Sequence, residues 1–286
     1  MSVLSEPTID FLNNGLGVWN KGAEKVWELL SIDPTKVGET VTNTGGVIES
    51  QGAPVWSFMA NTVQPIMVGL GTALVGVFFF WGWIKNSVDV KEDMRLENII
   101  RMLIRLCLAE FLVINNFKIM ALFFNSGTAL VRALSGPSWT QMEVSSGIRD
   151  TIMGYNFFQC LGIMILGCFF FIIIAVLSVM LILSVVNRFL KIFIAIPLGT
   201  VAFSTFAGDR EIAHSSSSYF KYALALAIEG AAIGLALIAG ARIVTSINLF
   251  GDSSVFLWMV EKVFEIAAVL GVVKGIQEII NRVFGI

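Results

Sequence analysis

The side chains whose types could carry out chemistry lie in one polar stretch between two apolar ones, "AGDREIAHSSSSYFKY", residues 207–222. It contains the only histidine, His214, four consecutive serines and two of the three tyrosines. A nucleophilic serine needs a placed base, and a metal needs several ligands, which one histidine does not supply. The chain also lacks the HExxH, GxSxG and Walker A motifs. We therefore expect no enzyme, no cofactor and no metal site.

The composition is that of an integral membrane protein. Of the 286 residues, 56% are hydrophobic and 14% are charged, whereas about a quarter are charged in soluble domains. The net charge of −2 shows no basic excess of the kind that neutralises nucleic-acid phosphates. Three cysteines lie within apolar stretches and without metal-ligand spacing, so we expect them to be buried apolar residues. They are Cys107, Cys160 and Cys168.

Five segments are long enough to cross a membrane, because about 20 apolar residues span the hydrocarbon. They are the uncharged run between Glu49 and Lys85 and the segments 96–134, 157–186, 222–241 and 255–284. A further segment, 187–206, is short between its charges and contains Pro197, so we expect a re-entrant or interfacial piece. The predicted fold is all-α, a polytopic transmembrane helical bundle of about five spans.

The chain divides into a polar tail, 1–52, and a transmembrane domain, 53–286. The tail contains an amphipathic helix from about Pro7 to Leu30, followed by a polar loop. This helix could lie on the membrane surface or pack on its own bundle. Basic residues concentrate in the loops near 85–98 and 187–221, so the positive-inside rule predicts an outside tail and a cytoplasmic C-terminus.

Charged residues within the predicted spans form a second set of candidates. An ionisable side chain in hydrocarbon is costly and normally faces a bundle interior, a neighbouring subunit or water. Pairing inside a monomeric bundle and snorkelling near the helix ends are the alternatives. The candidates for a pore or an interface are Arg101, Arg105, Glu110, Lys118, Glu229, Glu265 and Lys274.

The order of these parts, with "NRFLKIFIAIPLGTVAFSTF" followed by "SSSSYFKYALALAIEGAAIGLALIAG", resembles the TrbL-like family. This family supplies the polytopic inner-membrane subunit of type IV secretion and conjugation systems. The resemblance covers about residues 55–250 and is most specific around Arg188, Lys191, Pro197 and Leu198. It implies a channel or scaffold subunit in a homo-oligomeric ring, with a pentamer favoured. It also implies other membrane subunits, cytoplasmic ATPases and membrane lipids as partners, and single-stranded DNA with its relaxase as the substrate.

In this interpretation the loop 187–221 faces the cytoplasm and could dock an ATPase or a coupling protein. An ordinary solvated connector is the alternative. The docking candidates are Arg188, Lys191, Asp209, Arg210, Glu211 and His214.

Two other functions remain open from the sequence. A small-solute secondary transporter would suit an intramembrane Glu229 and a segment broken near Pro197, although no internal repeat is visible. A purely structural anchor of a larger complex would need neither a substrate nor a conducting path.

Overall fold

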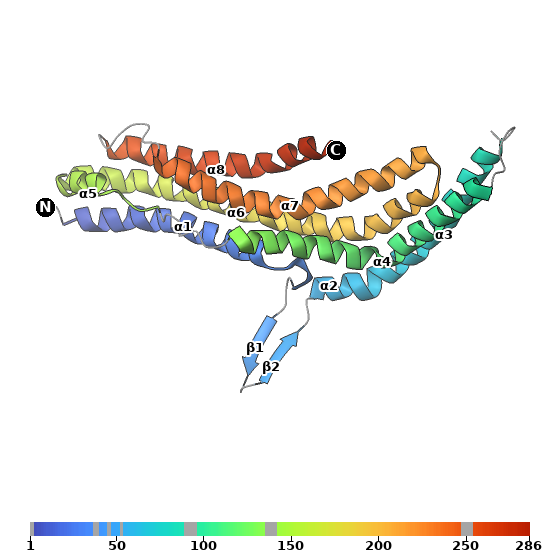
Figure 1. Ribbon diagram of the computed structural model, residues 1–286. Coiled ribbons are helices and arrows are strands. Elements are labelled where there is room, and N and C mark those ends of the chain that lie inside the picture. Colours follow the sequence, from blue (N-terminus) through green and yellow to red (C-terminus); the bar gives the residue numbers. More distant parts are fainter. Residues whose placement is uncertain are drawn as a thin grey trace. The chain divides into compact units, whose positions relative to one another are not determined.

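The computed structural model describes residues 3–36, 40–44, 47–51, 54–88, 96–134, 142–246 and 254–286 (Figure 1). Side chains are described in these ranges except at 40–51, 86–88, 96–98, 210 and 244–246. The long helices are α1 (Ser5–Ser31), α3 (Gln64–Val88), α4 (Leu96–Leu134), α6 (Phe157–Ser204), α7 (Arg210–Ser246) and α8 (Val255–Phe284). The short elements are η1 (Pro34–Lys36), α2 (Pro54–Phe58), η2 (Met59–Val63), α5 (Ser146–Met153) and η3 (Thr205–Ala207). The predicted all-α class is therefore confirmed.

One small element departs from the all-helical pattern. β1 (Thr40–Thr44) and β2 (Val47–Gln51) pair as an antiparallel hairpin, with Thr44 opposite Val47. The sequence interpretation of this stretch as a plain polar loop was wrong. A Gly-Gly pair between two Thr- and Val-containing runs is a known hairpin signal.

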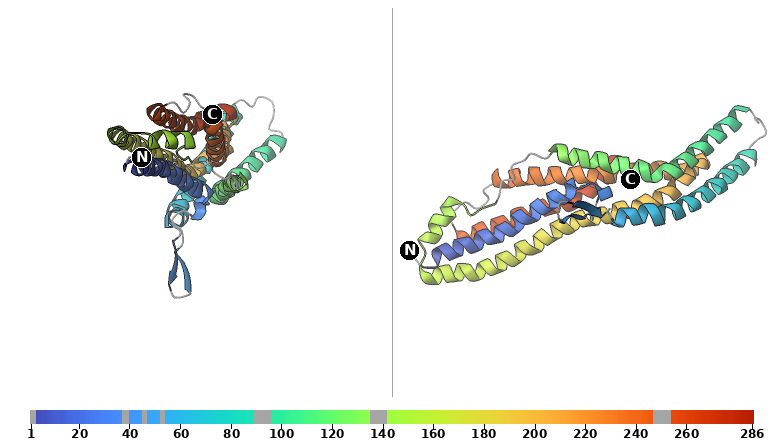
Figure 2. Two further views of the ribbon diagram at one scale, coloured as in Figure 1. Left: turned by 90° about the vertical axis from the view of Figure 1, so that its left-hand side faces the viewer. Right: turned by 90° about the horizontal axis from the view of Figure 1, so that it is seen from below.

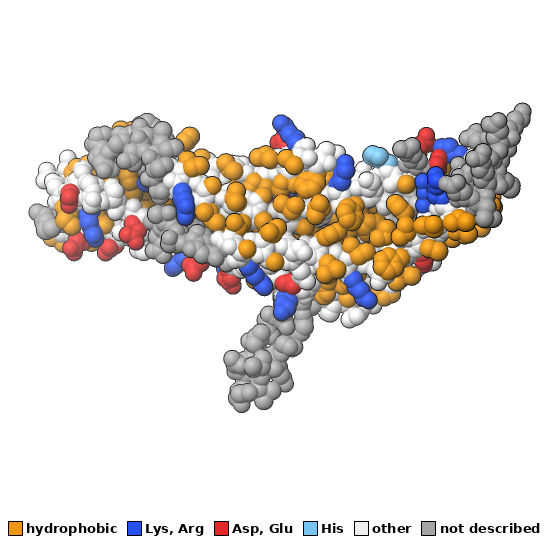
Figure 3. All heavy atoms as spheres, in the orientation of Figure 1, with side chains coloured by type: hydrophobic (Ala, Val, Ile, Leu, Met, Phe, Trp, Pro, Cys, Tyr) orange, Lys and Arg blue, Asp and Glu red, His pale blue; other side chains and the backbone are white. Residues whose placement is uncertain are grey.

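Four helical segments of the described chain are long and apolar enough to cross a membrane. They are Pro54–Lys85, Ile99–Leu134, Phe157–Ala207 and Glu211–Ile243. The prediction of about five spans included α8, which is helical as expected but is not among these four. In Figure 3, apolar side chains cover much of the face shown.

The segment 187–206 is not a separate re-entrant piece. α6 continues through it as one helix of 48 residues, with Pro197 inside. Such a helix is about 72 Å long, more than twice the roughly 30 Å of hydrocarbon in a bilayer. A tilt of about 40°, the upper end of the usual range, would still leave it spanning about 55 Å. Part of α6 therefore lies outside the hydrocarbon.

The chain forms two compact units, which we describe separately. Unit 1 contains Met1–Ser31, Leu130–Asn187 and Gly230–Glu278. Unit 2 contains Ile32–Ala129, Arg188–Glu229 and Ile279–Ile286.

In unit 1, α1 lies along the first part of α6 (Figures 1 and 2). The Phe11 and Phe171 rings are stacked with their centroids 6.1 Å apart, and Ser178 of α6 donates to the Val18 carbonyl. Trp27 lies against Gly234 of α7, where an added Cβ would be 3.2 Å from the indole. These contacts show α1 packed on its own bundle through its apolar side. Its exposed side carries Glu6, Asp10, Lys21, Glu24, Lys25 and Glu28.

The core of unit 2 is formed by α3, α4 and the parts of α6 and α7 that belong to it. Buried apolar side chains of all four helices meet there, including Val75, Val113, Ile196 and Leu226. The helices approach closely at Gly127, whose Cα faces the backbone of Ala227. This core places polar side chains from different helices within reach of one another.

Candidate functional site: polar side chains inside unit 2

The first polar contact of unit 2 lies next to a proline within α6. Pro197 has no N–H and so interrupts the hydrogen-bond ladder of the helix. Just before it, Asn116 of α4 donates from Nδ2 to the Ile196 carbonyl at 2.7 Å. Tyr219 of α7 donates from its hydroxyl to the Ala195 carbonyl at 2.8 Å. Polar side chains of two helices therefore bind the backbone of a third helix next to its proline.

A glycine makes this arrangement possible. A Cβ at Gly199 would collide with the Tyr219 hydroxyl and with Asn116 Oδ1. The Tyr219 ring is also held edge-on by Phe203, with the centroids 5.3 Å apart. Because Asn116 is fully buried, its bond to the backbone fixes α4 against α6 in one register.

Three charged side chains of α6 and α7 form a second group. Lys191 Nζ lies 3.5 Å from Glu229 Oε1, and Glu229 is buried. Arg188 is 1% exposed, and its guanidinium nitrogens have no hydrogen-bond partner among the described residues. The group therefore holds two cations and one carboxylate largely away from water. The structure therefore places Arg188, one of the predicted docking residues, in the interior rather than on the surface.

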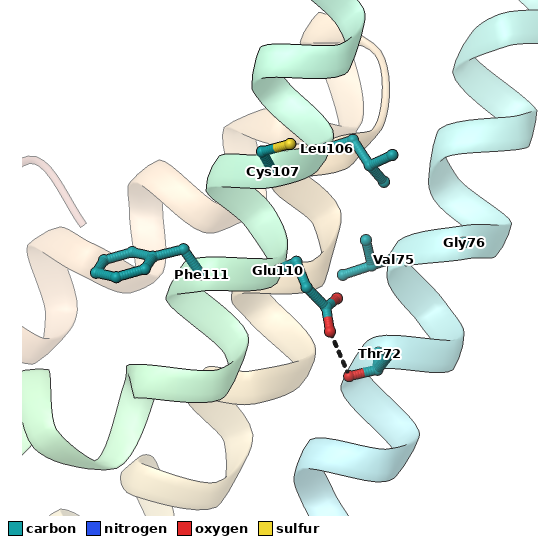
Figure 4. Close-up of a pocket in the computed structure, with 7 residues that line it drawn as sticks. All are labelled: Thr72, Val75, Gly76, Leu106, Cys107, Glu110 and Phe111. Carbon is teal, nitrogen blue, oxygen red and sulfur yellow. Dashed lines mark hydrogen bonds between the residues drawn. The ribbon is translucent and has the colours of Figure 1, made fainter.

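A groove between α3 and α4 contains the third feature, a carboxylate within a candidate membrane span (Figure 4). Thr72 of α3 donates to Glu110 Oε1 of α4 at 3.0 Å. The groove has a volume of about 530 Å³ and is otherwise apolar apart from the Thr72 hydroxyl and the Cys107 thiol. Its lining residues are Thr72, Val75, Gly76, Leu106, Cys107, Glu110 and Phe111.

The polar stretch that opened the sequence analysis is helical rather than a loop. The chain turns at Gly208 and Asp209, and α7 begins at Arg210. The prediction of a loop over 187–221 was therefore wrong, because these residues extend the helices on both sides of a short turn. Lys85 of α3 secures this turn, with Nζ 2.8 Å from Asp209 and 2.9 Å from Glu211.

The first turns of α7 present polar side chains on one helical face. His214 and Ser215 are exposed, and Ser218 lies next to them with its hydroxyl 3.4 Å from His214 Nδ1. Lys221 continues this face and is exposed. The Arg210 side chain lies outside the described ones.

The predicted pore or interface residues are spread over both units. Arg101 and Lys118 of α4 are exposed, and Arg105 is half-buried. In unit 1, Glu265 is buried and accepts from Lys262 at 2.8 Å, while Lys274 is exposed with Nζ 3.8 Å from Met180 Sδ. Five candidates belong to unit 2 and two to unit 1, so they do not make up one site of either unit.

The cysteine prediction was wrong for two of three residues. Cys160 is buried, but Cys107 and Cys168 are exposed. In the part of the chain that the structure describes, no three His, Cys, Asp or Glu side chains gather where a metal ion could bind.

Sequence reasoning missed several residues of this site. Asn116 and Tyr219 were not selected, although each is a polar residue within a candidate span. That polarity was their signal, because a polar side chain in an apolar span needs a partner inside the protein. Lys85 and Thr72 had no comparable signal, since their partners lie 124 or more and 38 residues away respectively.

Comparison with known proteins gives one family. The sequence model described as TrbL/VirB6 plasmid conjugal transfer like protein matches residues 34–200, more than half of the chain. No curated protein and no solved structure gives a significant match.

Proposed function

The chain belongs to the TrbL/VirB6 family of conjugal transfer proteins, and from this premise we propose that it forms a ring of identical subunits that passes DNA with its bound protein across the cytoplasmic membrane. The family is a membrane component of type IV secretion and conjugation systems rather than a known group of enzymes. The protein thus acts by assembling and by enclosing a path. It carries out no catalytic step of its own.

The observation that carries the proposal is the set of charges on α4. This helix is a candidate span, yet Lys118 is exposed on it and Glu110 faces an open groove. Charged groups at such positions must meet water or another protein, because hydrocarbon does not solvate them. Neighbouring copies and a hydrated path between them supply both environments.

The length of α6 supports assembly independently. Apolar side chains are exposed along nearly its whole length, from Phe158 at 82% to Leu198 at 54%. Since lipid covers only about 30 Å, the remaining apolar surface requires protein neighbours. Other copies and the other membrane subunits of the system supply them.

The orientation follows from the basic residues. The positive-inside rule favours a cytoplasmic position for the residues between α3 and α4 and for the turn at Gly208 and Asp209. This orientation leaves α1 on the outer side. A fifth crossing by α8 would bring the C-terminus into the cytoplasm. Cytoplasmic ATPases then meet the turn around Asp209 and Glu211, where the Glu211 side chain is 82% exposed.

A transfer assay tests the proposed function. We expect that replacing both Arg101 and Arg105 by alanine lowers DNA transfer while the protein still inserts into the membrane. The matched control replaces Lys21 and Lys25 by alanine, two exposed cations of α1, and it should transfer DNA normally. Wild-type transfer by the Arg101 and Arg105 variant, or a purified protein whose mass in lipid nanodiscs is that of a monomer, would reject the proposal.

A further inference from the structure

We propose that the Glu110 groove is filled by the first turns of α7 from the adjacent copy, with the polar face of that helix providing hydrogen-bond donors to Glu110. The α7 polar face is defined here as His214, Ser215, Ser218 and Lys221. This proposal rests on the proposed function, because it requires a ring, and it deepens that function by naming the contact between subunits.

A polar group fits the groove better than an apolar one, because the groove contains the Glu110 carboxylate. Glu110 is held by Thr72 through Oε1, and its surroundings are apolar (Figure 4). Acyl chains offer no hydrogen-bond donor to a carboxylate, so lipid is a poor occupant at this position. Serine hydroxyls and an imidazole N–H are donors that fit between closely packed helices.

The Glu110 groove and the α7 polar face also lie at the same height along the helices of unit 2. Tyr219 contacts α6 from Ala195 to Phe203, which includes the level of Thr200. The Thr200 carbonyl faces Gly71, the residue before Thr72, and an added Cβ there would be 3.2 Å from it. Ser215 and Ser218 precede Tyr219 by four residues or fewer, which is about 6 Å of helix. Glu110 and the two serines are therefore at nearly equal heights.

Equal height matters because of the symmetry of a ring. Rotation about an axis normal to the membrane keeps each residue at its own depth. A side chain of one copy can thus meet only residues of similar depth in the next copy. Ser215 and Glu110 satisfy this condition.

The Glu110 groove and the α7 polar face point in different directions, so the α7 polar face cannot fill the Glu110 groove of its own copy. On α3, Lys85 contacts α7 through Glu211, whereas Gly76 lines the groove. Lys85 follows Gly76 by nine positions, which places the two about 180° apart on the helix. A polar face on one side and an acceptor groove on the other give a head-to-tail contact, the kind that closes into a ring.

Small residues on both sides allow the helices to approach closely. A Cβ added at Gly76 of the groove would meet nothing within 4 Å. The incoming face offers serines rather than large side chains. Membrane helices associate through such small residues because backbone-to-backbone packing replaces the missing hydrophobic drive.

A native cysteine makes the contact testable. Cys107 lines the groove and is exposed. The test protein keeps Cys107, carries Cys160→Ala and Cys168→Ala, and adds Ser215→Cys. Oxidation in native membranes with copper phenanthroline should give a ladder of covalent oligomers, because each copy carries both halves of the link. Disulfide formation needs Cα atoms within about 7 Å.

Two controls and one further variant make the result specific. The first control pairs Cys107 with Leu198→Cys, which is exposed on α6 close to the layer of Thr200, and it should give no ladder. The second pairs Ser215→Cys with Cys107→Ala and should also give none. Glu110→Leu in the test protein should lower the ladder yield several-fold, while Lys21→Leu, at an exposed position of α1, should not.

The outcomes separate this proposal from the function on which it rests. A ring by mass in which the Ser215→Cys test protein gives no ladder would overturn the interface and leave the ring in place. Covalent dimers without larger oligomers would indicate a two-fold contact between copies, which would also overturn the proposed interface. A monomer by mass would reject both. Full reaction of Cys107 with a membrane-soluble maleimide in the assembled protein would show a lipid-filled groove and overturn the interface as well.

Discussion

Unit 1 and unit 2 are both helical and apolar, but they are held together by different means. In unit 1, α1 packs on α6 mainly through rings and small residues, such as Phe11 on Phe171 and Gly22 beside Ser178, and the hydrogen bond from Ser178 to the Val18 carbonyl is long, at 3.3 Å. In unit 2, Asn116 joins two helices through a fully buried hydrogen bond of 2.7 Å to the Ile196 carbonyl. Apolar packing and a long hydrogen bond tolerate a small shift, whereas an unsatisfied buried polar group is costly. Unit 2 should therefore respond more strongly to single substitutions.

The largest effect is expected in the buried charge group of unit 2. Glu229→Leu removes the carboxylate that faces Arg188 and Lys191, and removing one partner of a buried ion pair costs about 3–5 kcal/mol. The free energy of unfolding in mild detergent, followed by circular dichroism, measures this loss. Glu229→Gln is the control of equal size and should lose less, because its amide oxygen still accepts hydrogen bonds.

A double variant shows whether the loss comes from charge. Adding Arg188→Met to Glu229→Leu should recover part of the stability, because it removes one of the two cations that the carboxylate had faced. Equal stability of the single and the double variants would contradict this explanation.

The next effect concerns helix approach in unit 2. Gly127→Ala places a methyl group against the Ala227 carbonyl, which is backbone and cannot rotate away. Overpacking of this kind costs about 1–3 kcal/mol. Gly162→Ala in α6 is the matched control, since its Cβ meets nothing within 4 Å. Its free energy of unfolding should be no lower than that of the wild type. A Gly127→Ala protein as stable as the control would show that α4 and α7 can separate freely.

The third prediction tests the contact beside Pro197. Tyr219→Phe removes the donor to the Ala195 carbonyl while keeping the ring against Phe203. Because this carbonyl still accepts from the Gly199 N–H within the helix, we expect the loss of one ordinary hydrogen bond, about 1 kcal/mol. Unfolding of the purified protein with denaturant measures this loss in the free energy of unfolding. Tyr155→Phe, a half-buried tyrosine that precedes α6, is the control and should change stability little.

The smallest effect is expected in unit 1. Gly22→Ala brings its methyl group onto the Ser178 hydroxyl, which can rotate away, and to 3.1 Å from the Ser178 Cβ, which needs a shift of only a few tenths of an ångström. We expect a loss of about 1 kcal/mol or less, and Ser178→Ala in the same protein should recover most of it. If Gly22→Ala cost more than Gly127→Ala, the contrast between the two units would fail.

Several elements could be predicted because they depend on local pattern alone. The apolar run of α6, the bounds of α4 and α8 and the amphipathic α1 followed from residue order. The re-entrant segment failed because Pro197 was taken as a break. The helix continues through it, because a proline removes only the backbone hydrogen bond to the Phe193 carbonyl. Asn116 and Tyr219 hold the neighbouring turn of α6 against α4 and α7.

The candidate residues were harder to predict than the helices. Arg188 and Asp209 both looked like residues of a cytoplasmic loop, but Arg188 is buried and Asp209 pairs with Lys85. Glu110 was selected for its charge, while its groove and its partner Thr72 became visible only in three dimensions.

The sequence by itself determined that this chain is a helical membrane protein of the conjugal transfer family, because hydrophobicity and segment order are properties of neighbouring residues. Only the tertiary structure decided which charges are buried, which are paired and which face a groove. Those properties depend on residues such as Thr72 and Glu110, 38 positions apart. The packing of α3, α4, α6 and α7 brings such residues together, and no local pattern encodes that packing.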